Sequence, residues 1–466
     1  MRKLLQLIAL GVALLLPRAV PAALPAQPNF IFILIDDMGY GDLGCYGGSA
    51  KTPELDRVAK EGIRFTQFYV TAPICSPSRC GVITGQWPQR WGITSFLENR
   101  ASNTQRGMAQ WLDLKAPSIA RTLKSAGYAT GHFGKWHLGG QRDVGEAPLI
   151  TEYGFDASLT NFEGLGDRVL PVMGGFDGRP EERLRLGVGS EKLGRGEITW
   201  APRHEVTARF ADKATGFIIR AAAEGKPFYI NLWPDDVHSP FSPPPGKPAD
   251  TKEARYRSVL ENLDAQLGSL FDEVRSHPDL FDNTLVLVAS DNGPEPGAGK
   301  AGGFRGSKGF LYEGGLREPL LAWGGLVAES RRGTVDETTI LSALDIAPSF
   351  TRLANPAAEL AGDGEDFSAT LTGRVGPGKP RAKPLFWRRP PDRAKMGDTP
   401  APDLAIREGD WKLLMQAGGS SVQLYNLASD PAEGNNLSSA EPGRAKELAT
   451  ILQAWDASLP PVPANR

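Results

Sequence analysis

Cysteine and histidine are scarce in this chain of 466 residues, which holds three cysteines and five histidines. Three cysteines are too few for a disulfide framework. Charge of one sign is not in excess either, since 52 Lys and Arg balance 54 Asp and Glu, and no run of like charge is long enough to follow a nucleic-acid backbone. We therefore expect neither a disulfide-stapled fold nor a nucleic-acid partner.

Long hydrophobic runs are missing after the first residues. The chain starts with Arg2 and Lys3, continues with an apolar run over residues 4–16, and reaches a small-residue site that ends at Ala22. This run is shorter than the roughly 20 residues that a membrane helix needs. A secretory signal peptide over residues 1–22 accounts for all these features. We expect an exported protein, periplasmic or secreted, that depends on the export machinery and has no membrane span.

The rest of the chain has a globular composition, with 41% hydrophobic and 23% charged residues. Strand and helix patterns alternate along most of it. Buried strands are expected at 30–35, 128–133, 228–233 and 284–290, and helices at 53–61, 118–126, 204–224 and 252–275. This alternation predicts an α/β fold with a large, mostly parallel central sheet flanked by helices.

The pattern changes after about residue 375. A stretch rich in Pro, Gly, Lys and Arg, residues 376–384, comes first. Short strands are then expected at 385–388, 404–407, 411–415 and 422–425, and a last helix at 444–455. We therefore divide the exported chain into a main domain, residues 23–375, and a small C-terminal antiparallel α+β subdomain, residues 376–466.

Carboxylates follow two of the predicted strands. Asp36 and Asp37 come directly after the first strand, and Asp291 and Asn292 after the fourth. A single Asp in such a place usually caps the next helix. The carboxyl ends of parallel strands meet at one edge of a sheet, so three carboxylates there would repel one another without a cation. An all-oxygen ligand set favours Ca²⁺ or Mg²⁺ over zinc and copper.

The most specific segment is residues 75–85, which read Cys-Ser-Pro-Ser-Arg-Cys-Gly-Val-Ile-Thr-Gly. This segment resembles the signature of the type I, formylglycine-dependent sulfatases, which is Cys-x-Pro-x-Arg with Thr-Gly downstream. In that family a separate maturation enzyme oxidises the cysteine to Cα-formylglycine. The resemblance therefore implies such an enzyme as a partner of this chain.

Further segments extend the resemblance over roughly residues 29–354. They are Gly-Lys-Trp-His at 134–137, His238 after a predicted strand, Gly-Ser-Lys-Gly at 306–309 and Glu-Gly-Gly-Leu-Arg-Glu-Pro at 313–319. The resemblance implies an arylsulfatase-like enzyme on the alkaline-phosphatase-like scaffold, with residues 23–375 as the catalytic domain. The calcium ligands it implies are Asp36, Asp37, Asp291, Asn292 and the converted Cys75.

The resemblance also implies catalytic roles. Arg79 and Lys135 would hold and polarise the formylglycine hydrate, one hydroxyl of which attacks the sulfate sulfur with help from Asp291 and the metal. His238 or Lys308 would protonate the departing alcohol. His137 would then remove the proton of the second hydroxyl so that sulfate leaves. The side chains expected to contact the substrate are Lys135, His238, Lys308 and Arg305.

The implied substrate is a sulfated carbohydrate or another organic sulfate ester. Loop residues near the motifs are pocket candidates, although solvated loops have the same composition: Arg90, Trp91, Arg142, Asp143, Asn161, Phe162, Glu163, Asp235 and Asp236. Two alternatives stay open, a phosphate or phosphonate ester hydrolase of the same superfamily and a sulfoglycan-binding protein with an unconverted Cys75. Cys45 and Cys80 are either joined in a disulfide or free thiols.

Overall fold

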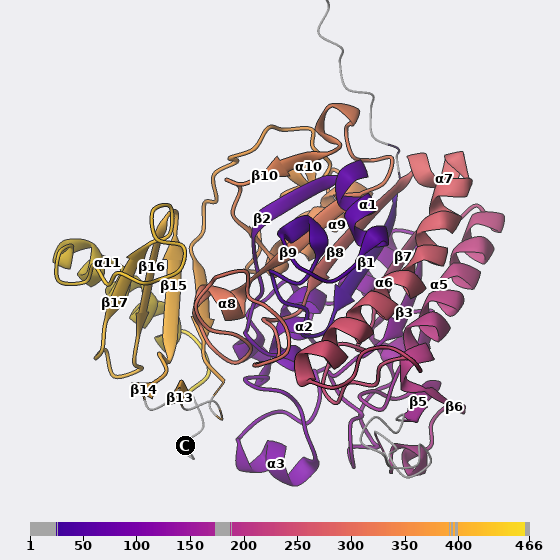
Figure 1. Ribbon diagram of the computed structural model, residues 1–466, viewed down its shortest axis with the longest axis horizontal. Helices are drawn as coiled ribbons and strands as arrows, with labels where there is room; N and C mark the ends of the chain where they lie inside the picture. Colours follow the sequence, from indigo (N-terminus) through magenta and orange to yellow (C-terminus); the bar gives the residue numbers. More distant parts are fainter. Residues whose placement is uncertain are drawn as a thin grey trace, which may run out of the picture.

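A mixed sheet of nine strands forms the centre of the molecule (Figure 1). The computed structural model describes residues 25, 27–172, 187, 189–390, 392, 395–396 and 399–461, so the predicted signal peptide lies outside the described residues. The strand order is β10-β2-β9-β8-β1-β7-β3-β4, and β11 pairs with β2. All these strands are parallel except β9, which is antiparallel to both β2 and β8. The predicted mostly parallel sheet is confirmed.

The strands of the central sheet are β1 (Asn29–Ile35), β2 (Ile63–Tyr69), β3 (Ala129–Gly134), β4 (Ala157–Leu159), β7 (Phe228–Trp233), β8 (Thr284–Ser290), β9 (Arg317–Trp323), β10 (Thr334–Asp336) and β11 (Leu341–Ser342). Every residue of β1 and β8 is buried, because helices cover both faces of the sheet. The register places Ile35 opposite Ser290, so the residues that follow these two strands emerge side by side.

Helices pack on each face. On one face the core contains side chains of α1 (Pro53–Glu61), α5 (Val206–Ala223), α6 (Lys252–Ser276) and α7 (Pro278–Asp282). On the other it contains side chains of α2 (Cys75–Thr84), α4 (Ile119–Ser125), α9 (Ile346–Ala354) and α10 (Ser368–Leu371). The part of the molecule built around the central sheet also contains two short helices, α3 (Arg100–Gln105) and α8 (Glu313–Leu316), and a two-stranded sheet of β5 (Arg168–Val172) and β6 (Ile198–Pro202).

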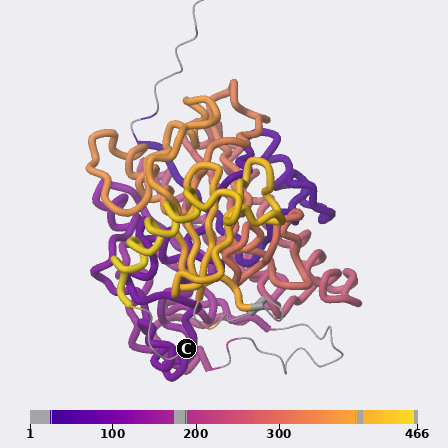
Figure 2. Tube along the Cα trace, turned by 90° about the vertical axis from the view of Figure 1, so that its left-hand side faces the viewer, coloured from indigo at the N-terminus to yellow at the C-terminus, as the bar shows by residue number. Residues whose placement is uncertain are grey.

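The C-terminal region forms an antiparallel sheet of β12 (Leu385–Arg388), β15 (Leu404–Glu408), β16 (Trp411–Met415) and β17 (Gln423–Asn426), with β13 (Lys395–Met396) and β14 (Thr399–Pro400) as a separate pair. Helix α11 (Pro442–Ala457) covers one face of the four-stranded sheet. The other face packs against the main body, where the Trp387 Nε1–H donates to the Val70 carbonyl at 2.7 Å. Figure 2 shows this region lying over the rest of the molecule. The predicted antiparallel sheet and helix are therefore confirmed.

Every strand and helix that the sequence predicted is present, with ends within two residues of the expected ones. The disulfide alternative is wrong. Cys45 and Cys80 are free thiols that belong to the cores on opposite faces of the sheet. A strand layer between them excludes a bond, which needs Cα atoms within about 7 Å.

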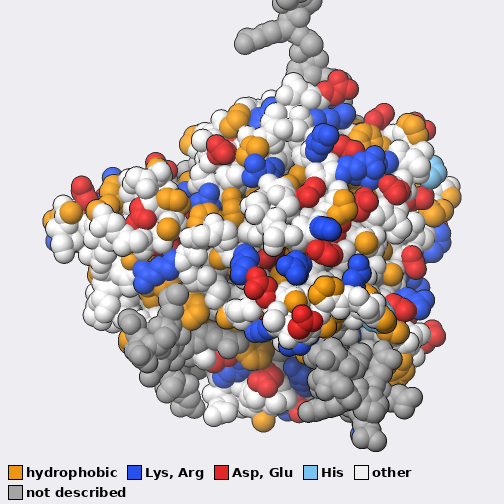
Figure 3. Space-filling model, in the orientation of Figure 1, with side chains coloured by type: hydrophobic (Ala, Val, Ile, Leu, Met, Phe, Trp, Pro, Cys, Tyr) orange, Lys and Arg blue, Asp and Glu red, His pale blue; other side chains and the backbone are white. Residues whose placement is uncertain are grey.

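Acidic and basic side chains are interspersed over the face shown in Figure 3, as the near-zero net charge leads one to expect. Within the part of the chain that the structure describes, no helix combines the length and the apolar character needed to cross a membrane.

Candidate active site

Three carboxylates meet at the carboxyl edge of the central sheet. Asp36, Asp37 and Asp291 are fully buried, and each places an oxygen within 4.8 Å of the others. The Asp37 backbone lies in the left-handed region at φ 60°, and its N–H donates to Asp291 Oδ1 at 3.2 Å. Asn292 Nδ2 donates to Asp37 Oδ1 at 2.7 Å. The sequence-predicted metal ligands are thus brought together.

The donor set fits a hard cation. Oδ1 of Asn292 is a buried acceptor with no hydrogen-bond donor among the described residues. Burial and the neighbouring Asp36 charge raise the pKa of Asp291 well above its usual value. A divalent ion would satisfy the amide oxygen and offset the repulsion between the carboxylates, and the all-oxygen set suits Ca²⁺ or Mg²⁺.

Two cations, Arg79 and Lys135, lie against the carboxylates of Asp36 and Asp291. Arg79 Nη2 lies 2.8 Å from Asp291 Oδ2 and 3.1 Å from Asp36 Oδ1. Lys135 Nζ donates to Asp36 Oδ2 at 2.7 Å. Burial raises the pKa of Asp36, but Lys135 and Arg79 outweigh that effect and hold it well below its usual value. Asp36 is therefore ionised and able to bind a metal.

Cys75 opens helix α2 and is 1% exposed. Its Sγ, an oxygen of Asp36 and a ring nitrogen of His238 all lie within 4.8 Å of one another. Burial and the Asp36 charge raise the pKa of the Cys75 thiol, so the unmodified side chain stays protonated and is a poor nucleophile. The fold thus places this cysteine at the carboxylate cluster without activating the thiol.

Lys308 and His238 both lie close to the Asp37 carboxylate. Lys308 Nζ donates to Asp37 Oδ2 at 2.6 Å, and His238 Nε2 lies 3.9 Å from the same oxygen. The His238 side chain is 32% exposed, which makes it the most accessible side chain of the cluster. These two residues therefore combine contact with the carboxylates and access from solvent.

His137 occupies a separate buried position two residues after Lys135. Its Nε2 lies 2.8 Å from the Leu97 carbonyl oxygen and 2.8 Å from Glu163 Oε2. This pairing could not be predicted from the sequence, because Glu163 follows His137 by 26 residues and lies in a loop without periodicity. Glu163 was expected only as a pocket candidate.

Several other pocket candidates have partners within the protein. Arg90 binds Asp363 through two hydrogen bonds of 2.8 and 2.9 Å. Asp235 accepts from Arg203 at 2.8 Å. Arg305, expected at the substrate, donates to the Tyr425 hydroxyl at 3.1 Å and stacks on a tyrosine ring at 3.9 Å. These side chains hold loops and the C-terminal sheet in place.

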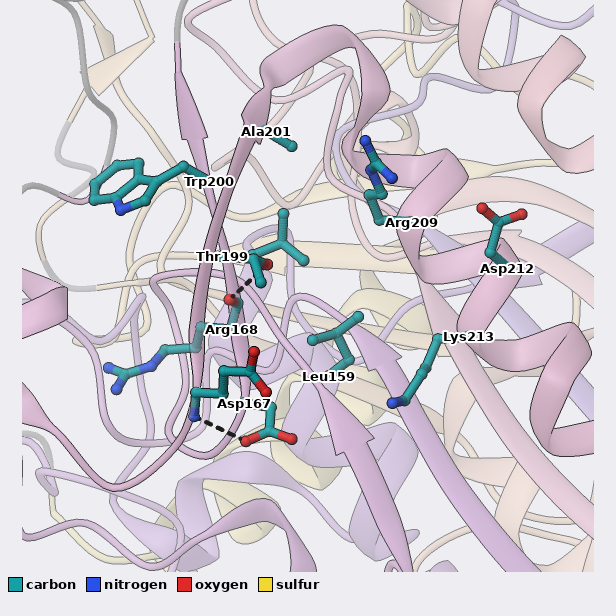
Figure 4. A pocket seen from close by; sticks show the side chains of 11 residues that line it. Leu159, Asp167, Arg168, Thr199, Trp200, Ala201, Arg209, Asp212 and Lys213 are labelled. Carbon is teal, nitrogen blue, oxygen red and sulfur yellow. Dashed lines mark hydrogen bonds between the residues drawn. The ribbon is translucent and has the colours of Figure 1, made fainter.

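Two sizeable cavities contain none of the predicted site residues. One, of about 570 Å³, is lined by β5, β6 and α5 (Figure 4). In that view the Trp200 ring points away from Arg209 and Lys213. The other, of about 760 Å³, lies around the first residues of β1 and β7, at the sheet edge opposite the carboxylates. Neither cavity belongs to the cluster described above.

Comparison with known proteins agrees with this geometry. The model of the Sulfatase family matches residues 28–356, which include the carboxylates, Cys75 and the surrounding cations. The chain belongs to the sulfatase family. The enzyme is thus a hydrolase of the arylsulfatase-like kind.

Relatives of this sulfatase match it over nearly its whole length. Arylsulfatase A of Homo sapiens is 32% identical over 485 aligned positions, which cover 95% of this chain and 89% of the relative. An N-acetylgalactosamine-6-O-sulfatase of Bacteroides thetaiotaomicron is 28% identical and covers 92% and 93% of the two chains.

Solved structures share the fold. The PsFucS1 sulfatase from Pseudoalteromonas sp. superposes with a TM-score of 0.71 at 25% identity, covering 93% of this chain and 90% of the other. Ps i-CgsB in complex with k-i-k-neocarrahexaose gives a TM-score of 0.74 at 24% identity, with 92% of each chain covered. The second likeness concerns the fold alone.

Proposed function

We propose that this sulfatase removes sulfate from a sulfated carbohydrate, using a formylglycine at position 75 and a calcium ion. The observation that carries the proposal is the juxtaposition of Cys75 with the cluster of Asp36, Asp37 and Asp291. The carbohydrate substrate is supported by the relatives, one of which acts on N-acetylgalactosamine 6-sulfate by its name.

The calcium ion would be held by Asp36, Asp37, Asp291, Asn292 and residue 75. A cation there offsets negative charge on the sulfate oxygens. Arg79 fixes the carboxylates, since its guanidinium contacts Asp291, Asp36 and the Lys135 carbonyl oxygen, the last at 2.8 Å. The metal ligands are therefore positioned by a side chain that is itself fully buried.

A formylglycine hydrate supplies a nucleophile that can expel sulfate again by returning to the aldehyde, which an ordinary Cys or Ser cannot do. Asp291 assists by taking a proton from this nucleophile. Lys135 binds its anionic form and, together with His238 and Lys308, contacts the substrate. His238 and Lys308 are the groups placed to protonate the leaving alcohol, and His137 takes the proton that allows sulfate to leave.

Conversion of Cys75 requires a maturation enzyme, and a signal peptide over residues 1–22 directs the chain to the export machinery. We propose a periplasmic or secreted enzyme, with residues 23–375 as the catalytic domain and residues 376–466 as the C-terminal subdomain.

The test is a panel of sulfated mono- and oligosaccharides, with matched phosphate esters, offered in calcium to protein produced together with the maturation enzyme. We expect sulfate release from at least one sugar and far slower phosphate release. Faster phosphate release would favour a phosphate or phosphonate ester hydrolase. An intact Cys75 thiol by peptide mass, with binding of sulfated sugars and no release, would favour a binding protein.

A further inference from the structure

Glu163 is a buried carboxylate whose nearest charged neighbour is a catalytic candidate. Its side chain is 6% exposed, and its Oε2 lies 2.8 Å from His137 Nε2. Its other oxygen lies 3.7 Å from an Arg142 guanidinium nitrogen. Removing a charged carboxylate from water costs free energy. We therefore expect the burial of Glu163 against an imidazole to serve a role beyond packing.

The two partners of His137 Nε2 determine its protonation. A carbonyl oxygen, from Leu97, lies at 2.8 Å, and a carbonyl oxygen can only accept a hydrogen bond. Nε2 therefore carries the ring hydrogen and donates it, with the Glu163 carboxylate adjacent. The other nitrogen, Nδ1, is buried and has no hydrogen-bond partner among the described residues. The free electron pair of the ring is thus on Nδ1.

We propose that Glu163 is the positioning residue of His137: with the Leu97 carbonyl it fixes the Nε2–H tautomer and stabilises the imidazolium that forms when Nδ1 takes a proton. The inference deepens the proposed function, since it rests on His137 acting as a base. A carboxylate paired with the far nitrogen orients a catalytic histidine and increases its basicity in the same way in other enzymes.

The surrounding charges show why a carboxylate is needed. Burial lowers the pKa of His137 and the Lys135 ammonium lowers it further, whereas Glu163 acts in the opposite direction. Burial raises the pKa of Glu163, but His137, Lys135 and Arg142 outweigh it, so this carboxyl is ionised. Without the Glu163 charge, His137 would be a weaker base in a more positive environment.

The first experiment needs no catalysis. Nitrogen chemical shifts of the five histidines are recorded against pH on the full-length exported protein with an unconverted Cys75. We expect His137 in the Nε2–H tautomer, and a lower His137 pKa in Glu163→Gln. Glu163→Asp should restore part of the difference, and Glu205→Gln, beside the partly exposed His204, serves as the matched control. A His137 ring protonated on Nδ1, or a pKa unchanged by Glu163→Gln, would overturn the proposal.

The second experiment measures kinetics of the matured enzyme. Because His137 acts after the alcohol has left, Glu163→Gln should lower kcat and KM together by about 10- to 100-fold and leave kcat/KM nearly unchanged. The acidic limb of kcat should move to lower pH, since a histidine of lower pKa stays neutral there. Loss of kcat/KM with an unchanged pH profile would contradict the role. A wild type that releases no sulfate contradicts the proposed function instead, and leaves the tautomer result standing.

Discussion

Single residues at the carboxyl edge of the sheet decide whether the site can hold a metal. Asp291 is central, because Arg79 binds one of its oxygens and the Asp37 N–H the other. The meeting of Asp36, Asp37, Asp291 and Asn292 could be predicted, since each of the two adjacent pairs directly follows a buried strand. The Glu163 partner of His137 was not predictable as such, because it comes from an irregular loop.

Asp291→Asn should abolish calcium binding, since it removes one of the charges that balance the ion. Wild-type protein in calcium at about 1,000 times the dissociation constant should gain about 4 kcal/mol of stability, and the variant none. The measurement is thermal unfolding with and without calcium. Asp410→Asn, at an exposed position after β15, is the control and should respond like the wild type. A calcium-dependent rise in the Tm of Asp291→Asn would refute the ligand assignment.

The close packing of helix α2 determines where Cys75 lies. A Cβ on Gly81 would lie 2.4 Å from Thr71 Oγ1 and 2.5 Å from its Cγ2, so only glycine allows the helix to lie this close. Gly81→Ala should therefore destabilise the protein by about 1–3 kcal/mol. It should also lower activity more than the lost stability explains, because the helix that begins at Cys75 must move.

Gly216 in α5 provides the matched control for this element. A Cβ there meets its nearest atom, an Arg220 guanidinium nitrogen, at 3.6 Å. Gly216→Ala should stabilise the protein by about 0.5–1 kcal/mol, since alanine is the better helix former. Urea unfolding and sulfate release of both variants test the pair, and equal behaviour of the two would show that α2 is not tightly constrained.

There is also a physical reason why the sequence did not reveal strand β9 and its direction. Strand β9 is buried along its whole length, like β8 beside it, and a strand buried on both faces has the same apolar pattern whichever way it runs. Its antiparallel direction depends on its pairing with β2 and β8. The residues of β9 alone carry no information about this pairing. The predicted strands, by contrast, are flanked by clear helices or turns.

At the scale of the whole molecule, one buried ion cluster joins the C-terminal sheet to the catalytic part. Lys412 of β16 lies 2.9 Å from Glu313 Oε1 and 3.0 Å from Glu433 Oε1, with all three side chains fully buried. Glu313 also accepts from the Tyr69 hydroxyl at 2.5 Å. These residues are far apart in sequence, so no motif could have indicated that they meet.

Lys412→Met should destabilise the protein by about 3–5 kcal/mol, because Glu433 is left buried without its cation and Glu313 keeps the more distant Arg317, at 3.6 Å. Burial already raises the pKa of Glu433 to about 7, and the loss of Lys412 raises it further. The variant should therefore lose stability as pH rises and recover part of it at pH 5, where a carboxyl of raised pKa is protonated. Urea unfolding at several pH values measures this. The exposed Lys446→Met should change stability by less than about 0.5 kcal/mol, and equal effects of the two variants would contradict the stabilising role of Lys412.

Sulfate release by the matured enzyme in calcium, measured side by side with its Cys75→Ala variant, tests the proposed role of residue 75 most directly. We expect sustained turnover by the first and none by the second, with both proteins folded and of similar Tm, because residue 75 supplies the nucleophile. Undiminished sulfate release by Cys75→Ala would contradict it.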